Sequence, residues 1–492
     1  MKTNQVKTGV QGLDELLHGG LTGSRMYLLE GDPGVGKTTL SMQFLLEGAR
    51  LGERSMYVTL SESKPEIEAV AAGHGWDLTA IDIYEMSSFA QLDDVRDQEN
   101  TPYAPDEVEL SERMAGLLAH VAEVNPKRVV IDSCSELRLL ARTPLRFRRQ
   151  ILALKSELIR RGCVVLLLEI PPATGSDVLL QSLVHGVLHL QRTTRPYGAD
   201  QRQLRVVKMR ERAAASGSHD YAIRRGGIVV FPRLVASEHI EPFAPQSCSS
   251  GLPGLDQLLG GGLDRGTCTL LMGPPGTGKS VVSTRFAYEA GLRGERSAIF
   301  AFDENVSTLL HRSASLGMLL EEMRSDGRIL LEQLDPAELS PGEFVHRVRE
   351  AVEKGGIRTV TIDSLNGYLH ALPDDRYILP QLHELLSFLR QRGVVTILVV
   401  AQHGVLGSAM NAVVDVSYLA DTILMFRHFE LEGHVKKAMS VLKKRTGTHE
   451  DTIRELRFAR DGFQLGPPLE AFRGVLTGVP EPIRRDAQEQ RD

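Results

Sequence analysis

Two stretches of the sequence have the residue types and spacing of a phosphate-binding loop. "GDPGVGKT" occupies residues 31–38 and "GPPGTGKS" occupies residues 273–280. Both fit the pattern G-x-x-x-x-G-K-[ST], and each lies between a short apolar run and an amphipathic stretch. The glycines let backbone N–H groups turn toward a phosphate at the start of a helix, where the helix dipole also favours an anion. The chain is therefore expected to hold two phosphate groups.

Each loop also supplies a lysine and a hydroxyl group. Lys37 and Lys279 are expected to reach the β and γ phosphates of a nucleotide, and Thr38 and Ser280 are expected to coordinate Mg²⁺ through their hydroxyl oxygens. The sequence thus predicts ATP and Mg²⁺ as ligands.

Carboxylates follow the loops at two further strand ends. Asp132 in "RVVIDS" and Asp363 in "TVTIDS" each close a β-branched run, where a carboxylate can support Mg²⁺. Between loop and aspartate, "YVTLSES" carries Glu62 and "FAFDEN" carries Asp303 and Glu304. Hydrolysis needs a carboxylate that holds the attacking water in line with the γ phosphate, so these three are candidate catalytic residues.

Two K-x-R pairs end later apolar runs. "VVKMR" contains Lys208 and Arg210, and "VLKKR" contains Lys443 and Arg445. In a regular strand the members of each pair share one face. Such cations can neutralise charge on a transferring phosphoryl group, and in ring ATPases they come from the neighbouring subunit.

The elements that position these residues occur twice. "TGVQGLDELLHGGLTGS" (8–24) matches "SGLPGLDQLLGGGLDRG" (250–266) at an offset of 242 residues, and the loops match at the same offset. Short β-rich runs alternate with helical stretches in each half, which predicts an α/β fold with a mainly parallel twisted sheet flanked by helices. The expected domains are 1–241 and 242–480, followed by a disordered tail, 481–492.

Composition indicates a soluble cytoplasmic protein. The formal net charge of −6 provides no overall attraction to nucleic acid, and no apolar run is long enough to span a membrane. The four cysteines show no metal-binding or disulfide spacing and are expected in the core. They are Cys134, Cys163, Cys248 and Cys268.

The tandem loops, the preceding "GLD-LL-GG", the strand-end "IDS" and the K-x-R pairs resemble the KaiC family of RecA-type ATPases over nearly the whole chain. The resemblance implies two tandem RecA-like domains and a homohexameric double ring with ATP and Mg²⁺ between protomers. It also implies ATP hydrolysis in the first tier and, in clock members, Ser/Thr autophosphorylation in the second. The nucleotide-binding positions that it carries over are Gly34, Val35, Gly36, Lys37, Thr38, Thr39 and His219 in the first half, and Gly276, Thr277, Gly278, Lys279, Ser280 and His449 in the second.

The chain departs from the family pattern at two places. The family's adjacent glutamate pair is Ser61 and Glu62 in the first half and Asp303 with Glu304 in the second. Where clock members carry adjacent Ser and Thr phosphoacceptors, "DVSYLADT" has Ser417 followed by a tyrosine. Ser417 is therefore the candidate phosphoacceptor.

The principal hypothesis is an ATP-hydrolysing hexamer with autokinase activity and a role in signalling or circadian-type regulation; regulatory protein partners are left open. One alternative is a DNA-dependent ATPase motor like RecA, because "LRLLARTPLRFRRQ" (137–150) contains five arginines, although only Phe147 there could stack on a base. Another is a nucleotide-binding scaffold, against which Glu62, Glu304 and both K-x-R pairs argue.

Overall fold

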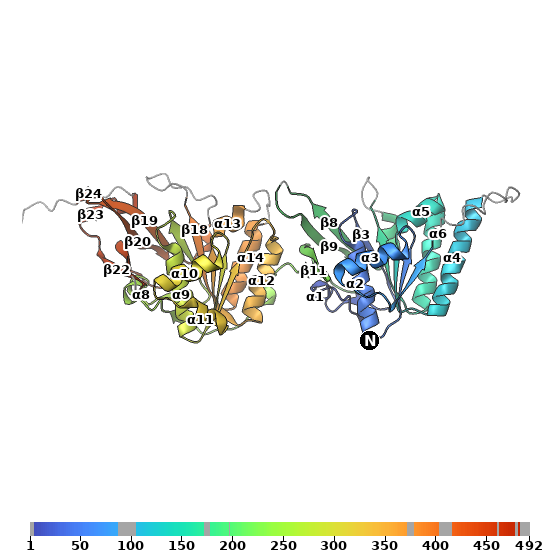
Figure 1. Ribbon diagram of the computed structural model, residues 1–492, viewed down its shortest axis with the longest axis horizontal. Coiled ribbons are helices and arrows are strands. Elements are labelled where there is room, and N and C mark those ends of the chain that lie inside the picture. Colours follow the sequence, from blue (N-terminus) through green and yellow to red (C-terminus); the bar gives the residue numbers. More distant parts are fainter. Residues whose placement is uncertain are drawn as a thin grey trace, which may run out of the picture. The chain divides into compact units, whose positions relative to one another are not determined.

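The computed structural model divides the chain into two compact units, Met1–Arg233 and Leu234–Asp492. It describes residues 4–86, 105–171, 178–195, 197–370, 378–402, 416–459, 462–477 and 481–482. Each unit has its own sheet and its own helices (Figure 1).

In its described residues, the first unit contains a nine-stranded sheet in the order β11-β10-β9-β8-β3-β7-β6-β4-β5. From β8 to β5 neighbouring strands are parallel, and β9, β10 and β11 extend the sheet in antiparallel fashion. The strands are β3 (Met26–Gly31), β4 (Ser55–Thr59), β5 (Ile81–Glu85), β6 (Arg128–Asp132), β7 (Val164–Glu169), β8 (Gly186–Thr193), β9 (Gln201–Met209), β10 (Ser218–Arg224) and β11 (Gly227–Phe231).

The second unit repeats this arrangement with strands β16-β15-β17-β18-β14-β19-β20-β21-β22. Six strands from β16 to β19 are again parallel, and β20, β21 and β22 are antiparallel. The strands are β14 (Cys268–Gly273), β15 (Arg296–Ala301), β16 (Ile329–Gln333), β17 (Ile357–Asp363), β18 (Val395–Ala401), β19 (Thr422–Leu431), β20 (His434–Lys444), β21 (Arg454–Ala459) and β22 (Gly462–Pro468).

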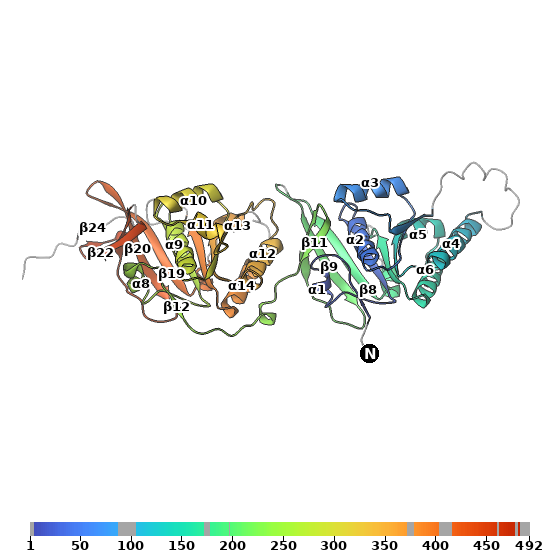
Figure 2. The same ribbon diagram turned by 60° about the horizontal axis from the view of Figure 1, so that its bottom comes forward.

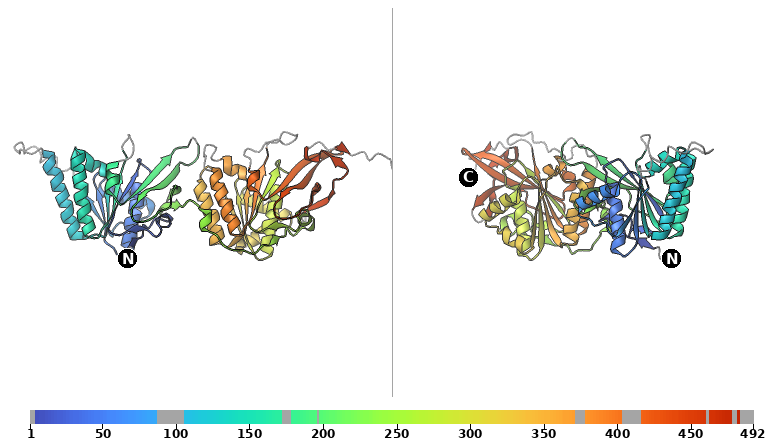
Figure 3. Two further views of the ribbon diagram at one scale, coloured as in Figure 1. Left: turned by 180° about the vertical axis from the view of Figure 1, so that it is seen from behind. Right: turned by 45° about the vertical axis from the view of Figure 1, so that its right-hand side comes forward.

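Helices cover both faces of each sheet, as the views in Figures 2 and 3 show. In the first unit these are α1 (Leu13–Leu16), α2 (Lys37–Arg50), α3 (Lys64–His74), α4 (Pro105–Val124), α5 (Cys134–Ala141), α6 (Pro144–Arg160) and α7 (Val178–Leu183). In the second they are α8 (Pro253–Leu258), α9 (Lys279–Leu292), α10 (Val306–Ser315), α11 (Leu320–Ser325), α12 (Pro341–Glu353), α13 (Leu365–His370) and α14 (Ile378–Gln391).

Smaller elements complete the units. They are the strand pairs β1 (Gln5–Val6) with β2 (Leu21–Thr22), β12 (Ser247–Cys248) with β13 (Leu263–Asp264), and β23 (Phe472–Arg473) with β24 (Glu481–Pro482), and the short 3₁₀ turns η3 (Ala236–Glu238), η4 (Ser417–Leu419) and η5 (Val475–Thr477). Of the expected tail, residues 483–492 lie outside the described residues.

Each sheet separates two apolar cores. In the first unit, Phe44 of α2 and Ile67 of α3 pack on one face, and Leu117 of α4 and Phe147 of α6 pack on the other. Strands buried on both faces require continuous apolar runs rather than alternation, which is why "VVLLLE" forms β7. The expected mainly parallel sheets with helices on both faces are confirmed in both units.

Along the sequence, the first compact unit ends at Arg233, before residue 241, where the repeat suggested that the first domain ends. Leu234 and Ala236 lie in an apolar core of the second unit. The backbone N–H of Ala236 donates to Glu384 Oε2 at 3.0 Å, and Arg392 pairs with Glu241 at 2.8 Å. These contacts attach residues 234–241 to the second sheet's helices.

Candidate nucleotide sites

The first phosphate-binding loop joins β3 to α2 at the middle of its sheet. Gly34 (φ 76°) and Gly36 (φ 98°) have left-handed backbone conformations, and Gly36 caps the N-terminus of α2. A Cβ atom on Gly36 would lie 2.9 Å from Ile223 Cδ1, so the position favours glycine for both its backbone and its space. The loop is therefore folded against a helix N-terminus, as anion binding requires.

The two loop lysines are buried in the same way. Lys37 Nζ donates to the backbone oxygens of Gly31 (2.6 Å) and Asp32 (3.0 Å), and burial lowers the pKa of this lysine. Lys279 Nζ donates to Gly273 (2.8 Å) and to the next carbonyl (2.7 Å), and burial lowers its pKa to about 8. A bound phosphate would place a negative charge beside these buried lysines and so favour their charged form.

In the first unit, three side chains meet at the end of β6. Thr38 Oγ1 donates to Asp132 Oδ2 at 3.1 Å, and the phenol of Tyr57 donates to the same oxygen at 2.5 Å. Tyr57 is fully buried, and its burial next to Asp132 raises the pKa of the phenol far above its usual value. Tyr57 therefore fixes the carboxylate beside the loop, a role that its place within an apolar strand did not reveal.

Glu62 follows β4 in the loop that leads to α3. Its backbone N–H donates to Thr59 Oγ1 at 3.0 Å, and its carbonyl accepts from the same hydroxyl at 2.7 Å. The side chain is exposed, yet local burial together with the negative charges of Asp132 and Glu66 raises the pKa of its carboxyl. A carboxylate with a raised pKa near the loop is suited to accept a proton.

Helix α3 begins with a cap that holds this loop in place. The backbone N–H and Oγ of Ser63 donate to Glu66 Oε2 at 2.7 and 2.8 Å, which completes a capping box. In the second unit Asn305 caps α10, accepting from Thr308 N at 2.8 Å. The residue before each cap is a candidate catalytic glutamate, so both glutamates stand at a defined loop-to-helix junction.

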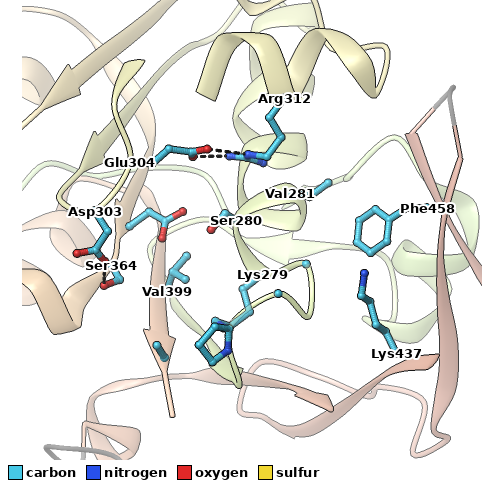
Figure 4. Close-up of a pocket in the computed structure, with 15 residues that line it drawn as sticks. Lys279, Ser280, Val281, Asp303, Glu304, Arg312, Ser364, Val399, Lys437 and Phe458 are labelled. Atoms are coloured by element: carbon cyan, nitrogen blue, oxygen red, sulfur yellow. Dashed lines mark hydrogen bonds and ion pairs between the residues drawn. The ribbon is translucent and has the colours of Figure 1, made fainter. Parts of the chain in front are cut away.

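The second loop faces a more crowded set of charges (Figure 4). Asp363 is half-buried at the end of β17, and burial raises the pKa of its carboxyl, although a hydrogen bond with Ser280 opposes that rise. Asp303 accepts a short hydrogen bond from Ser364 Oγ. Glu304 is held by Arg312, whose Nε and Nη2 donate to Oε1 at 3.1 Å and Oε2 at 2.8 Å.

These groups line a cavity of about 530 Å³, large enough for a nucleotide. Lys437 of β20 and Phe458 of β21 also line it, and the ammonium group lies 4.5 Å from the ring centroid. Arg312, Lys437 and Phe458 were not among the sequence candidates. Nothing local marks them, because Lys437 and Phe458 reach the loop only through pairing of distant strands.

The residues expected to hold Mg²⁺ have suitable donors. Thr38 with Asp132, and Ser280 with Asp363, each place one hydroxyl and one carboxylate beside a phosphate-binding loop. Mg²⁺ in such sites takes most of its ligands from phosphates and water. No cluster of three or more His, Cys, Asp or Glu that could hold a metal occurs among the described residues, which this ligand pattern does not require.

Each K-x-R pair contacts the segment before a strand that neighbours the phosphate-loop strand. This neighbouring strand is β8, beside β3, in the first unit and β19, beside β14, in the second. Lys208 Nζ donates to the carbonyl oxygens of Gln181 (2.5 Å) and Val184 (3.1 Å), and Arg210 donates to Ser182 (3.0 Å). Both side chains of the first pair therefore donate to the same short segment, 181–184. Within one chain the first pair binds the C-terminal carbonyls of α7.

The second pair makes equivalent contacts around the candidate phosphoacceptor. Lys443 Nζ donates to the backbone oxygens of Ser417 (3.3 Å) and Ala420 (2.7 Å), and Arg445 pairs with Asp421 at 3.4 Å. Ser417 is half-buried, whereas Tyr418 is 57% exposed.

Strand register separates the two candidate histidines. His219 pairs with the residue four before Lys208, whereas the residue four before Lys443 pairs with Arg454. In the fold His219 therefore corresponds to Arg454, and His449 lies in the loop before β21. His219 is also buried, and its Nδ1 accepts from a backbone N–H at 2.9 Å. Nucleotide contact by either histidine stays a prediction.

The arginine-rich segment 137–150 forms most of α5 and the start of α6. Phe147 is 1% exposed and packs beneath the Arg138 guanidinium, 4.8 Å from the ring centroid. The one aromatic ring expected to stack on bases is thus in the core, and a DNA motor is not favoured.

All four cysteines are buried, as expected. Among the described residues, no helix is long and apolar enough to cross a membrane.

The sheet order, the strand-loop-helix geometry and the paired aspartates define a protein of two tandem RecA-like P-loop domains. A family model described as "ATPase: KaiC" matches residues 6–235 and 248–470, so the chain belongs to the KaiC ATPase family. It is 26% identical over 498 residues to the circadian clock oscillator protein KaiC of Acaryochloris marina, covering 100% of this chain and 94% of the relative. It is 25% identical over 480 residues to the circadian clock protein KaiC3 of Synechocystis sp., covering 97% and 94%.

Proposed function

We propose that this chain is a Mg²⁺-dependent ATPase of the KaiC kind, which hydrolyses ATP at its first loop and acts as a cytoplasmic regulatory ring. One observation carries the hydrolysis proposal: Lys37, the Thr38–Asp132 pair and Glu62 surround a single phosphate-binding loop. The relatives' names support a place in circadian-type or other signalling.

The residues of the first unit divide the work of hydrolysis. The loop N–H groups and Lys37 would hold the β and γ phosphates, while Thr38 and Asp132 would hold Mg²⁺, whose charge would offset that of the phosphates. Glu62 orients a water molecule and takes its proton as the oxygen attacks the γ phosphorus. The bond between that phosphorus and the bridging oxygen breaks, and ADP leaves with the electron pair.

The K-x-R pairs are proposed to complete the sites of neighbouring protomers in a hexamer. They lie at the end of β9 and β20, beyond the edge of the parallel strands. Their hydrogen bonds within the chain hold each pair as a rigid unit, which would lower the entropy lost when it meets a phosphate. The finer proposal for the second unit is phosphoryl transfer from ATP to Ser417 of an adjacent protomer.

Glu62→Gln tests the hydrolysis proposal. The amide cannot accept the proton, so we expect turnover of ATP to fall about tenfold or more in a phosphate-release assay. Glu68→Gln is the matched control, because Glu68 is exposed on α3 and pairs only loosely with Lys64 at 4.0 Å. Unchanged turnover in Glu62→Gln would remove Glu62 from the mechanism.

A further inference from the structure

The two units differ in how their candidate catalytic glutamates are held. Glu304 makes a two-bonded ion pair with Arg312, at 3.1 and 2.8 Å. Among the described residues, the Glu62 carboxylate makes no ion pair. The difference is built into the helix that follows: Ser63 and Asn305 are equivalent caps, and counting from them places Val70 at the position of Arg312. Val70 is 45% exposed and offers no cation.

The ion pair lies inside the nucleotide cavity rather than on the outer surface. Glu304 and Arg312 both line the cavity with Lys279 and Ser280. Their side chains are 26% and 24% exposed, so solvent screens the pair only in part. Asp363, which is proposed to hold Mg²⁺, lines the same cavity, and the positive charge of Arg312 lowers the pKa of its carboxyl against the larger effect of burial. Figure 4 shows the carboxylate of Glu304 turned toward Arg312 above Ser280.

We propose that Arg312 is a positioning residue specific to the second unit, which holds Glu304 in a fixed orientation and restrains ATP hydrolysis at that loop. The inference rests on the proposed function. A carboxylate bound through both oxygens to a planar guanidinium has its orientation set by that fork. To align a water molecule behind the γ phosphate, Glu304 must turn away and break at least one charge-assisted hydrogen bond.

The second carboxylate at this site does not remove the restraint. Asp303 accepts a short hydrogen bond from Ser364 Oγ, and Ser364 directly follows Asp363 at the end of β17. Both acidic residues that could direct water in the second unit are therefore engaged by neighbours, whereas in the part of the first unit that the structure describes, Glu62 is restrained by the capped loop alone.

The test uses the full chain with the first-unit base removed. In a Glu62→Gln background, residual ATP turnover reports on the second unit. Arg312→Val, which copies Val70, is expected to raise kcat about fivefold with the KM for ATP changed by less than about twofold. Arg312→Gln is a second variant, in case valine disturbs α10, and should act in the same direction.

Two controls separate positioning from a general structural effect. Arg324→Val removes a half-exposed guanidinium of α11 that pairs with Glu321 at 3.6 Å, and should leave kcat unchanged. Adding Glu304→Gln to Arg312→Val should cancel the increase, because the arginine acts through that carboxylate. Unchanged or lower turnover in both Arg312 variants would overturn the proposal, as would an increase that survives Glu304→Gln. If Glu62→Gln alone leaves turnover intact, the proposed function fails instead.

Discussion

Asp132 and Asp363 occupy equivalent strand ends, yet single neighbouring residues give them different surroundings. Tyr57 of β4 donates to Asp132, and the strand register puts Ile299 at the equivalent position of β15. An isoleucine offers no hydrogen bond, so Asp363 receives none from that strand position. Burial raises the pKa of the Asp363 carboxyl. The two sites thus differ in hydrogen bonding although their loops match.

Phosphorylation of Ser417 is a prediction at the scale of one residue. After incubation with Mg-ATP, tandem mass spectrometry should find phosphate on Ser417 and not on Tyr418. The Ser417→Ala variant should lose it, and so should Lys279→Ala, because Lys279 holds the donor phosphates, whereas Lys64→Ala, at an exposed lysine, should retain it. A peptide containing Ser417 with no phosphate would exclude the autokinase activity.

At the scale of elements, each loop depends on the junction between a buried strand and a helix. β3 and β14 are central in their sheets, and α2 and α9 pack beneath them through side chains such as Phe44 and Phe286. The loops are therefore held by rigid elements at both ends. The glycine that caps each helix is the point where the chain must change direction.

Gly36→Ala should disrupt the first junction. Alanine with φ near 98° costs about 1–2 kcal/mol, and its Cβ would in addition press on Ile223. We expect a lower melting temperature and loss of ATP turnover at the first loop. Gly52→Ala is the matched control, since Gly52 has φ 76° but nothing within 4 Å of the added atom. It should show the backbone cost alone and keep turnover; equal turnover in both variants would contradict the role of Gly36.

At the scale of the whole molecule, the chain contains one architecture twice and differs between the copies in the groups around each loop. We propose above that a neighbour's cations complete each site, and such sites require assembly, so nucleotide binding and ring formation should be coupled. Light scattering is expected to show a particle of six chains with Mg-ATP and a smaller one without nucleotide. Lys37→Ala should weaken this assembly, whereas Lys64→Ala, at an exposed lysine, should not. A single-chain mass in saturating Mg-ATP would contradict the proposed hexamer.

Much of the fold could be predicted from the sequence, and so could the lysine, the hydroxyl and the strand-end aspartate of each site. The apolar runs before each loop and the aspartates after "VVI" and "VTI" are local patterns, and they identified β3, β6, β14 and β17. The K-x-R spacing likewise predicted two cations on one side of a strand. The sequence could not decide whether His219 and His449 are equivalent, because the connections before β10 and β21 differ in length; the strand register matches His219 with Arg454 instead.

The sequence by itself determined that two phosphate-binding loops exist and which lysine, hydroxyl and carboxylate accompany each. Those groups are fixed by short-range spacing on a strand-loop-helix unit. Only the tertiary structure decided which partners restrain them: Tyr57 on Asp132, Arg312 on Glu304, and Lys437 with Phe458 at the cavity wall. Arg312 depends on the direction of a side chain on the helix that follows Glu304, and the other partners depend on strand order, which brings together residues that no local pattern connects.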